Sequence, residues 1–202
     1  MEEITADWTS LPDGVSSESL WVTLHDGCLE SLHSDLTAST ISVSILVDYV
    51  VDFHNLPKET RFVLKLDTVT SVRADSFHAW PPAPVIPTNA TGLERVELMR
   101  GYHPKWRRQS VDWDSLEKRL QGEDVRIDIM DAEIAQHSNQ VGLRLEGMLV
   151  DDHGSYHFLF IHAGSISFSD SNGGVYNLDQ FLELGGRYWE AFGNHSTDNS
   201  AA

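Results

Sequence analysis

The feature that most constrains this chain is an alternation of apolar and polar residues that occurs once in each half. In the first half the alternation runs from Ile41 to Val47, and in the second half it runs from Val141 to Met148. A period of two is typical of strands with one buried face, because successive side chains of a strand point to opposite faces. The chain is therefore expected to be mostly β.

Similar segments flank both alternating segments in the same order. Each half has an opening segment before the alternation, and a third and a fourth strand after it. The corresponding segments are 24–30 and 129–134, 62–67 and 158–162, and 69–75 and 165–170. The similarity lies in pattern and order more than in identical residues. It indicates a divergent duplication, although two unrelated meanders would produce a similar pattern.

Turn-forming residues separate the predicted strands. Residues 55–58 precede the third strand of the first half, and residues 151–155 precede the third strand of the second half. Strands joined by short turns pair as antiparallel neighbours. We therefore predict a mostly β fold (β-rich α+β), in which two related antiparallel β-meander units pack together with two short helices. A pseudo-two-fold relation between the units would fit a duplication.

A proline-rich segment from Trp80 to Pro87 separates the two units. Proline lacks the N–H that ladders and helices need, so this segment is predicted to be an extended crossover. A short helix is predicted after it, because Asp112 is a good N-cap residue and Gly122 ends helices well. The apolar stripe of this helix consists of Trp113, Leu116 and Leu120.

A second helix is predicted from Leu178 to about Phe192. Asn177 is an N-cap residue and Gln180 follows three residues later, which is the pattern of a capping box. Gly185-Gly186 is expected to break this helix into two pieces.

These signals divide the chain into four parts that are expected to form one compact body, because neither β-unit alone offers much core. The parts are a first β-unit over 1–79, a crossover with a short helix over 80–122, a second β-unit with the C-terminal helix over 123–193, and a disordered tail over 194–202.

The net charge of the chain is −17, and it is unevenly spread. Residues 91–120 carry +2, whereas residues 1–90 carry −9 and residues 121–202 carry −10. Such a field repels nucleic acid and anionic membranes, so neither is expected as a partner. It attracts a basic protein. Acidity that only keeps the chain soluble would explain the same composition.

Cys28 is the only cysteine, so the chain can form no internal disulfide and no zinc site of paired cysteines. The N-terminus is acidic and lacks the charge pattern of a secretory signal. Both features predict a reducing compartment, and we expect a bacterial protein located in the cytoplasm.

Histidines offer the few candidates for metal chemistry. His25-Asp26 invites comparison with metal phosphohydrolases, but the sequence comparison matches this pair with Met130-Asp131, so the histidine is not repeated. A repeated aspartate at the start of a strand caps a turn more often than it binds a metal.

The densest histidine group contains His153, His157 and His162. An odd separation places His157 and His162 on opposite faces of a strand, so the three side chains are not expected to converge. We assign no catalytic residue, no metal site and no cofactor. The weak metal candidates are His153, His157, His162, His25 and Asp26.

Residues 100–108 form the one basic and aromatic segment of the chain. Trp, Tyr and Arg dominate the energetics of protein interfaces. The candidate interface residues are therefore Tyr102, Trp106, Arg107 and Arg108. The same residues would also serve to pair with acids of this chain or with a second copy of it.

The opening segment 24–30, the strand end 64–67 and the segment 69–72 resemble small β-rich immunity proteins of bacterial polymorphic toxin systems and related bacterial families. The second unit has a fainter similarity over 129–170. The resemblance implies a non-enzymatic inhibitor that binds a toxin through an acidic face, and it carries over no specific binding residue.

Three functions are weighed. The first is a non-enzymatic protein-binding module, such as an immunity-like inhibitor of a basic partner, as the acidity and the absence of catalytic motifs indicate. The alternative is a small-ligand-binding protein or metal-dependent enzyme that uses the histidine cluster. A structural homo-oligomer also remains open.

Overall fold

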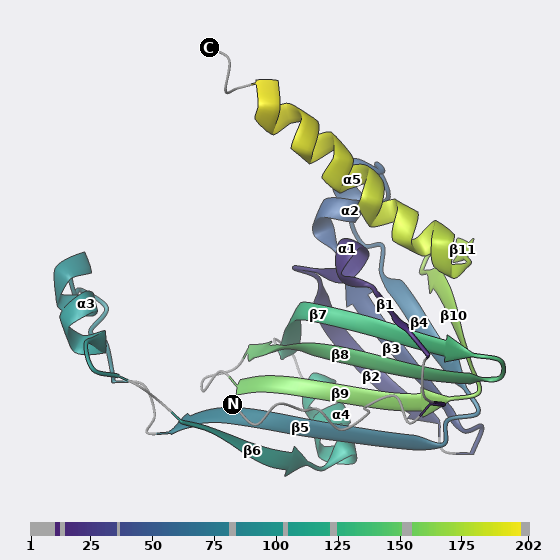
Figure 1. Cartoon of the computed structure of the whole chain (residues 1–202), viewed down its shortest axis with the longest axis horizontal. Coiled ribbons are helices and arrows are strands. Elements are labelled where there is room, and N and C mark those ends of the chain that lie inside the picture. The colour runs from purple at the N-terminus through teal and green to yellow at the C-terminus, as the bar shows by residue number, and fades with distance from the viewer. Residues whose placement is uncertain are drawn as a thin grey trace.

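The computed structural model describes residues 11–12, 15–35, 37–80, 84–102, 105–121, 125–150 and 155–198. Over these residues the chain forms eleven strands, all in one antiparallel sheet, and five helices (Figure 1). The predicted β-rich α+β fold is confirmed.

The strands and helices alternate irregularly along the chain. The strands are β1 (Ser17–Ser19), β2 (Cys28–Asp35), β3 (Thr40–Leu46), β4 (Phe62–Asp67), β5 (Ser71–Trp80), β6 (Lys105–Val111), β7 (Arg126–His137), β8 (Gln140–Val150), β9 (Ser155–Ala163), β10 (Ser165–Asp170) and β11 (Val175–Tyr176). The helices are α1 (Trp21–Leu24), α2 (Asp48–Phe53), α3 (Gly92–Met99), α4 (Trp113–Leu120) and α5 (Leu178–Asp198).

The two predicted units exchange their fourth strands. The sheet order is β11-β10-β4-β3-β2-β7-β8-β9-β5-β6, with β1 beside β7. The meanders β2–β3–β4 and β7–β8–β9 meet where β2 pairs with β7. From there β5 pairs with β9 of the second meander, and β10 pairs with β4 of the first. The order of equivalent strands is therefore the same in both directions from the β2–β7 junction.

Matching bulges support this pseudo-two-fold arrangement. In β2 the register shifts between Leu29 and Ser31, and in β7 it shifts between Ile129 and Asp131. The extra residue is Glu30 in one strand and Met130 in the other. The bulges therefore make Met130 equivalent to Glu30, not to His25 as the sequence comparison had it. A common ancestry of the two units stays a prediction.

The sheet encloses one core because β2 and β7 separate soon after they meet. They pair only at Cys28–Asp128 and Leu29–Ile127. Beyond these pairs the strands form two layers, with β7, β8, β9 and β5 in front of β2, β3 and β4 in Figure 1. Buried apolar side chains from both layers belong to a single cluster.

Different elements cover the edges that β2 and β7 leave open. β1 pairs with the C-terminal half of β7. On β2, the backbone N–H of Ser34 donates to the Glu117 carboxylate at 2.9 Å, and the Trp113 indole N–H donates to the Ser34 hydroxyl at 3.0 Å. Both of these partners come from α4, which thus satisfies groups that a neighbouring strand would otherwise pair with.

The prediction for α4 is confirmed. The Asp112 side chain accepts a hydrogen bond from the backbone N–H of Ser115 at 2.9 Å and caps the helix. Leu116 and Leu120 of the predicted stripe are buried.

The predicted start of α5 is also confirmed, because Asn177 and Gln180 cap each other's backbone N–H groups at 2.8 and 2.9 Å. The predicted break at Gly185-Gly186 is wrong, since α5 is continuous. A Cβ atom at Gly185 would lie 1.9 Å from the carbonyl oxygen of Val22. Glycine is thus needed there for the close approach of α1, not to break the helix. The helix also continues to Asp198, past the predicted start of the tail at 194.

The sequence analysis missed three helices and three strands, which are α1, α2 and α3 and β1, β6 and β11. α1 and α2 have four and six residues, too short for a helical period to be visible. The segment 80–122 was expected to contain an extended crossover over 80–87 and one short helix, but it also contains α3 and β6. Residues 81–83 of the predicted crossover lie outside the described residues.

Because α1 approaches α5 closely at Gly185, alanine substitutions at Gly185 and at its neighbour Gly186 should have different effects on stability. Replacing Gly185 with Ala should lower the free energy of unfolding by about 2–3 kcal/mol, because backbone atoms of α1 must move. Replacing Gly186 with Ala should raise it by up to about 1 kcal/mol, because a Cβ there meets nothing within 4 Å and alanine favours the helix. Urea denaturation of both variants measures this difference, and equal effects would contradict it.

Candidate protein interface

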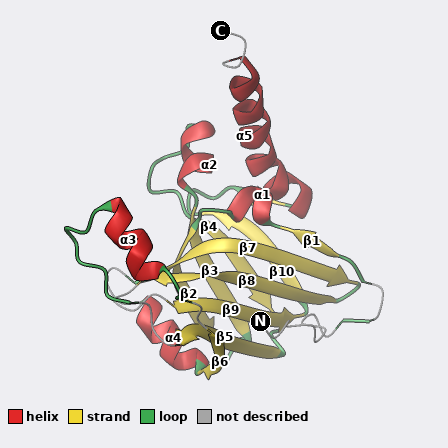
Figure 2. Cartoon of the chain, turned by 60° about the vertical axis from the view of Figure 1, so that its left-hand side comes forward, coloured by secondary structure: helices red, strands yellow, loops and turns green. Residues whose placement is uncertain are grey.

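The hairpin of β5 and β6 carries α3 away from the body of the protein. The two strands pair from Ala74–Val111 to Trp80–Lys105, at the edge of the sheet. Beyond the last pair the chain forms α3 before it returns. Figure 1 shows α3 standing clear of the sheet and of the other helices, and Figure 2 shows the molecule with this end turned toward the viewer. We call the described residues 84–102 together with β6 the arm.

Local interactions define α3. The Thr91 hydroxyl accepts a hydrogen bond from the backbone N–H of Glu94 at 3.4 Å, and the Glu94 carboxylate accepts one from the backbone N–H of Thr91 at 2.8 Å. This capping box lowers the pKa of Glu94 through the backbone and side-chain hydrogen bonds from Thr91. The pattern Thr91-Gly92-Leu93-Glu94 is the signal in the sequence that could have revealed the helix.

An apolar stripe on α3 is uncovered. All ten residues from 91 to 100 are exposed. Leu93, Val96 and Met99 follow one another at intervals of three and so share one face of the helix. Leu93 is 81% exposed and Val96 is 61% exposed. An eight-residue helix is marginal in water, so a surface that covered the stripe would stabilise it.

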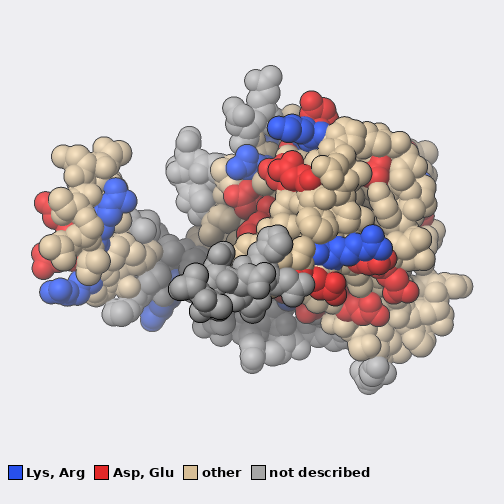
Figure 3. Space-filling model, turned by 90° about the horizontal axis from the view of Figure 1, so that it is seen from above, with Lys and Arg blue, Asp and Glu red and all other residues tan. Residues whose placement is uncertain are grey.

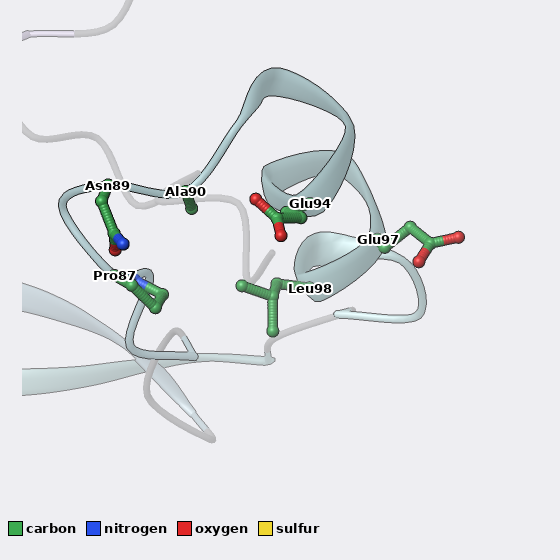
Figure 4. Close-up of a pocket in the computed structure, with 6 residues that line it drawn as sticks. All are labelled: Pro87, Asn89, Ala90, Glu94, Glu97 and Leu98. Carbon is green, nitrogen blue, oxygen red and sulfur yellow. The ribbon is translucent and has the colours of Figure 1, made fainter.

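The opposite side of α3 faces a shallow hollow (Figure 4). Leu98 points toward Pro87 across this hollow. Two carboxylates line the hollow, and both interact with neighbouring residues of the chain. Glu94 caps the helix, and Glu97 lies 3.8 Å from Arg100. The stripe is therefore the more informative surface of α3.

The arm is basic, whereas the rest of the chain is acidic. Residues 84–111 contain five Lys and Arg residues and two Glu residues, so they carry +3. Because the whole chain carries −17, the remainder carries −20. In Figure 3 acidic and basic side chains appear both on the body and on the projecting arm, so the excess of bases is a property of residues 84–111 as a whole.

The predicted interface residues all lie on the arm. The backbone N–H of Tyr102 donates to the carbonyl of Met99, which ends α3. β6 contains the other three, and the backbone of Trp106 pairs with that of Ala79. Arg107 is exposed, and its alternate position in the strand places it on the opposite face from Arg108.

Arg108 pairs with an acid of the chain itself, which the sequence analysis had left open. Its guanidinium lies 2.8 Å from the Asp75 carboxylate, and that of Arg73 lies 3.1 Å from the same oxygen. The Asp75 side chain is only 2% exposed. Arg108 therefore anchors the base of the arm to β5 and is no longer a candidate interface residue. The apolar stripe of α3, which the sequence analysis missed, replaces it in the candidate interface.

The described metal candidates have partners of their own. The Nε2 atom of His157, which is buried, lies 2.7 Å from the Ser155 hydroxyl, and Nδ1 of His162 lies 2.8 Å from the Ser71 hydroxyl. His153 lies outside the described residues.

The remaining metal candidates are His25 and Asp26, and His25 also has partners within the chain. His25 stacks on Trp21 and places Nδ1 3.2 Å from the carbonyl of Met130, while Asp26 is exposed beside it. Across the described ranges, no three His, Cys, Asp or Glu side chains are grouped to hold a metal ion.

Two further titratable clusters are internally satisfied. Burial raises the pKa of the Cys28 thiol to about 11, and its S–H donates to Asp128, so the thiol stays protonated. Arg144 lies within 3.6 Å of the carboxylates of Asp131, Glu133 and Glu146. Burial raises the pKa of Glu146, and the positive charge of Arg144 reduces this shift.

Comparisons with protein-family models, curated proteins and solved structures give no match for this chain. None of the helices that the structure describes is both long and apolar enough to cross a membrane.

The ion pairs of Asp75 give a test of how the arm is attached. Replacing Arg108 with Ala should lower the free energy of unfolding by about 1–3 kcal/mol, because the buried carboxylate loses one of its two guanidinium partners. Replacing Lys105, which is exposed on the same strand, with Ala should change the free energy of unfolding by less than about 0.5 kcal/mol. Urea denaturation measures both, and a harmless Arg108→Ala would show that the pair does not hold the arm.

Proposed function

We propose that this chain is a non-enzymatic protein-binding module and that the arm is its principal contact surface. The observation that carries the proposal is the uncovered stripe of Leu93, Val96 and Met99 on a helix that projects from the body. A fold with a well-filled core gains nothing from holding such a helix in water. Burial against another protein removes the apolar surface from water and stabilises the helix at the same time.

The composition of the arm supports a protein as the partner. The arm also carries Tyr102 and Arg107, and these residue types contribute most to the binding energy of interfaces. An apolar centre with a charged rim is the usual anatomy of a protein–protein contact. The charge of the arm would also speed association with an acidic surface.

The acidic body supports a further contact with a basic protein. With −20 outside the arm, electrostatic steering of a basic partner is expected. An immunity-like inhibitor of a basic toxin, located in the cytoplasm, is the form of this function that the sequence resemblance implies. The alternative of a metal-dependent enzyme has no grouped ligands among the described residues to support it.

Capture from a lysate of the source organism tests the role of the arm. The immobilised chain should retain specific proteins, whereas a variant with Leu93→Glu and Val96→Glu should retain at least tenfold less of them, because charge on the stripe opposes its burial. The control is Val175→Glu, which places the same charge on an apolar side chain of β11 that is 78% exposed.

The outcome is measured by quantitative mass spectrometry of the retained proteins. Both variants alter only exposed residues, and unchanged thermal unfolding would verify that they fold. Equal retention by the wild-type chain and the stripe variant would overturn the proposal. Proteins bound to the acidic body should additionally be released by high salt, which screens exposed charges.

A further inference from the structure

An aromatic surface lies where α1, α2 and α5 meet, at the opposite end of the sheet from α4 (Figures 1 and 2). Six side chains of these three helices form it, and we call them the aromatic cap. They are Trp21 of α1, Tyr49 and Phe53 of α2, and Tyr188, Trp189 and Phe192 of α5.

The rings of the cap contact one another in a continuous row. Trp21 stacks on Trp189 with ring centroids 5.3 Å apart, and Trp189 lies 5.0 Å from Tyr188. Tyr188 in turn lies 4.5 Å from Tyr49 and 6.1 Å from Phe192. The ends of the row are uncovered, since Phe192 is 58% exposed and Trp21 is 39% exposed.

Hydrogen bonds to one carbonyl group hold the central rings in place. The Trp189 indole N–H donates to the carbonyl oxygen of Val22 at 2.9 Å, and the Tyr49 hydroxyl donates to the same oxygen at 3.1 Å. The orientation of these rings is therefore fixed before any partner arrives, so binding on them orders few additional side chains.

Carboxylates lie beside the rings of the cap. Tyr49 and Phe53 are four residues apart on α2, and so are Asp48 and Asp52, so the two pairs form neighbouring rows on this helix. Both aspartates are exposed, and Phe53 is 40% exposed. A third carboxylate, Asp26, follows α1. Burial raises the pKa of Tyr49, and the nearby negative charge of Asp26 raises it further.

The negative charge beside the cap is not neutralised by bases of the chain. Among the described residues, no Lys or Arg pairs with Asp26, Asp48 or Asp52, and the one Arg of the three helices, Arg187, pairs with Glu183 at 2.5 Å. The three helices and their adjoining turns, over 21–27, 48–58 and 178–193, contain six Asp and Glu residues and two Lys and Arg residues, so they carry −4. The cap is therefore aromatic at its centre and negative at its rim.

This combination of charge and aromatic surface selects a basic protein segment as the occupant. Aromatic faces, those of Trp above all, attract Arg and Lys cations, and the carboxylates of the rim would pair with the same cations. Apolar side chains of the segment would cover the exposed rings. A second copy of the cap is disfavoured, because two negative rims would meet.

We propose that the aromatic cap binds a segment of a partner protein that combines arginine or lysine residues with apolar ones. The proposal rests on the proposed function, because it gives a protein-binding module a second contact surface that is separate from the arm. It also assigns the contact with a basic protein to a defined place on the acidic body. Apolar side chains of the segment lie on the rings, and its cations reach Asp26, Asp48 and Asp52.

A fluorescent peptide serves as the probe of this surface. About ten residues alternate arginine with leucine, so that the extended peptide has one basic and one apolar face. Fluorescence anisotropy at about 50 mM salt should show saturable binding to the full wild-type chain. Citrulline in place of arginine removes the charge and should weaken binding about tenfold or more. Serine in place of leucine removes the apolar contact and should weaken it about fivefold or more.

A ring variant and a matched control locate the apolar contact. Replacing Phe53 and Phe192 with Ser should weaken binding of the arginine–leucine peptide about tenfold or more, because two exposed rings of the cap are lost. Replacing Leu93 and Val96 with Ser removes two exposed apolar side chains from the arm and should leave binding within about twofold of the wild type.

A rim variant and its control separate the rim from the general acidity of the chain. Replacing Asp48 and Asp52 with Asn should weaken peptide binding about threefold or more. Glu97→Gln with Asp114→Asn changes the net charge by the same amount at exposed positions of α3 and α4, and should weaken binding less than about 1.5-fold. Thermal unfolding of each variant, unchanged from the wild type, would verify that a loss of binding is not a loss of folding.

Four outcomes would overturn the proposal. The wild-type chain does not bind the peptide, or the peptide with serine in place of leucine binds equally well, which leaves charge alone as the attraction. The rim variant and its control lose binding equally, which assigns the binding to the whole acidic body. The chain alone sediments as a dimer that the ring variant loses, which makes a second copy the occupant.

Failure of this proposal is distinguishable from failure of the proposed function. Peptide binding reports on the cap, whereas capture of proteins that the stripe variant loses reports on the arm. A chain that captures proteins through the stripe but does not bind the peptide keeps the proposed function and loses the cap as a contact surface. A chain that binds the peptide through the cap, but captures the same proteins with and without the stripe, loses the arm as its principal contact surface.

Discussion

The exchange of β5 and β10 between the two meanders is the constraint on which the rest of the structure depends. The meanders themselves meet at two residue pairs only, Cys28–Asp128 and Leu29–Ile127. Two pairs are too few to hold two layers over a shared core, whereas β5 on β9 and β10 on β4 add long antiparallel ladders in both directions. The exchange also places β5 next to the edge of the sheet, where its hairpin with β6 can project.

Most strands and the helices α4 and α5 were predictable because their signals are local. Alternation marks β3 and β8, and side-chain caps mark the starts of α4 and α5. The strand exchange was not predictable, because periodicity shows that a strand has a buried face but not which strand it pairs with. Gly185 was misinterpreted for a related reason, since its contact with Val22 involves residues far apart in the sequence.

The candidate site was predictable in its chemistry but not in its geometry. The mixture of Tyr, Trp and Arg predicted a candidate interface in the segment 100–108, and the structure places the described residues of that segment on the arm. Arg108 is nevertheless bound to the buried Asp75 carboxylate, which no spacing rule would reveal. The stripe of α3 was missed because eight residues show little more than two helical turns, although the capping box at Thr91 marks the start of the helix.

The paired strands β5 and β6 give the arm its physical significance. The bases that make the arm positive lie on β6, within the sheet, and Arg108 among them pairs with Asp75. The projecting residues 84–102 contain two Arg and two Glu residues and so carry no net charge. The free energy that α3 can gain on contact therefore comes mainly from burial of its apolar stripe, which the hairpin of β5 and β6 holds away from the core of its own chain.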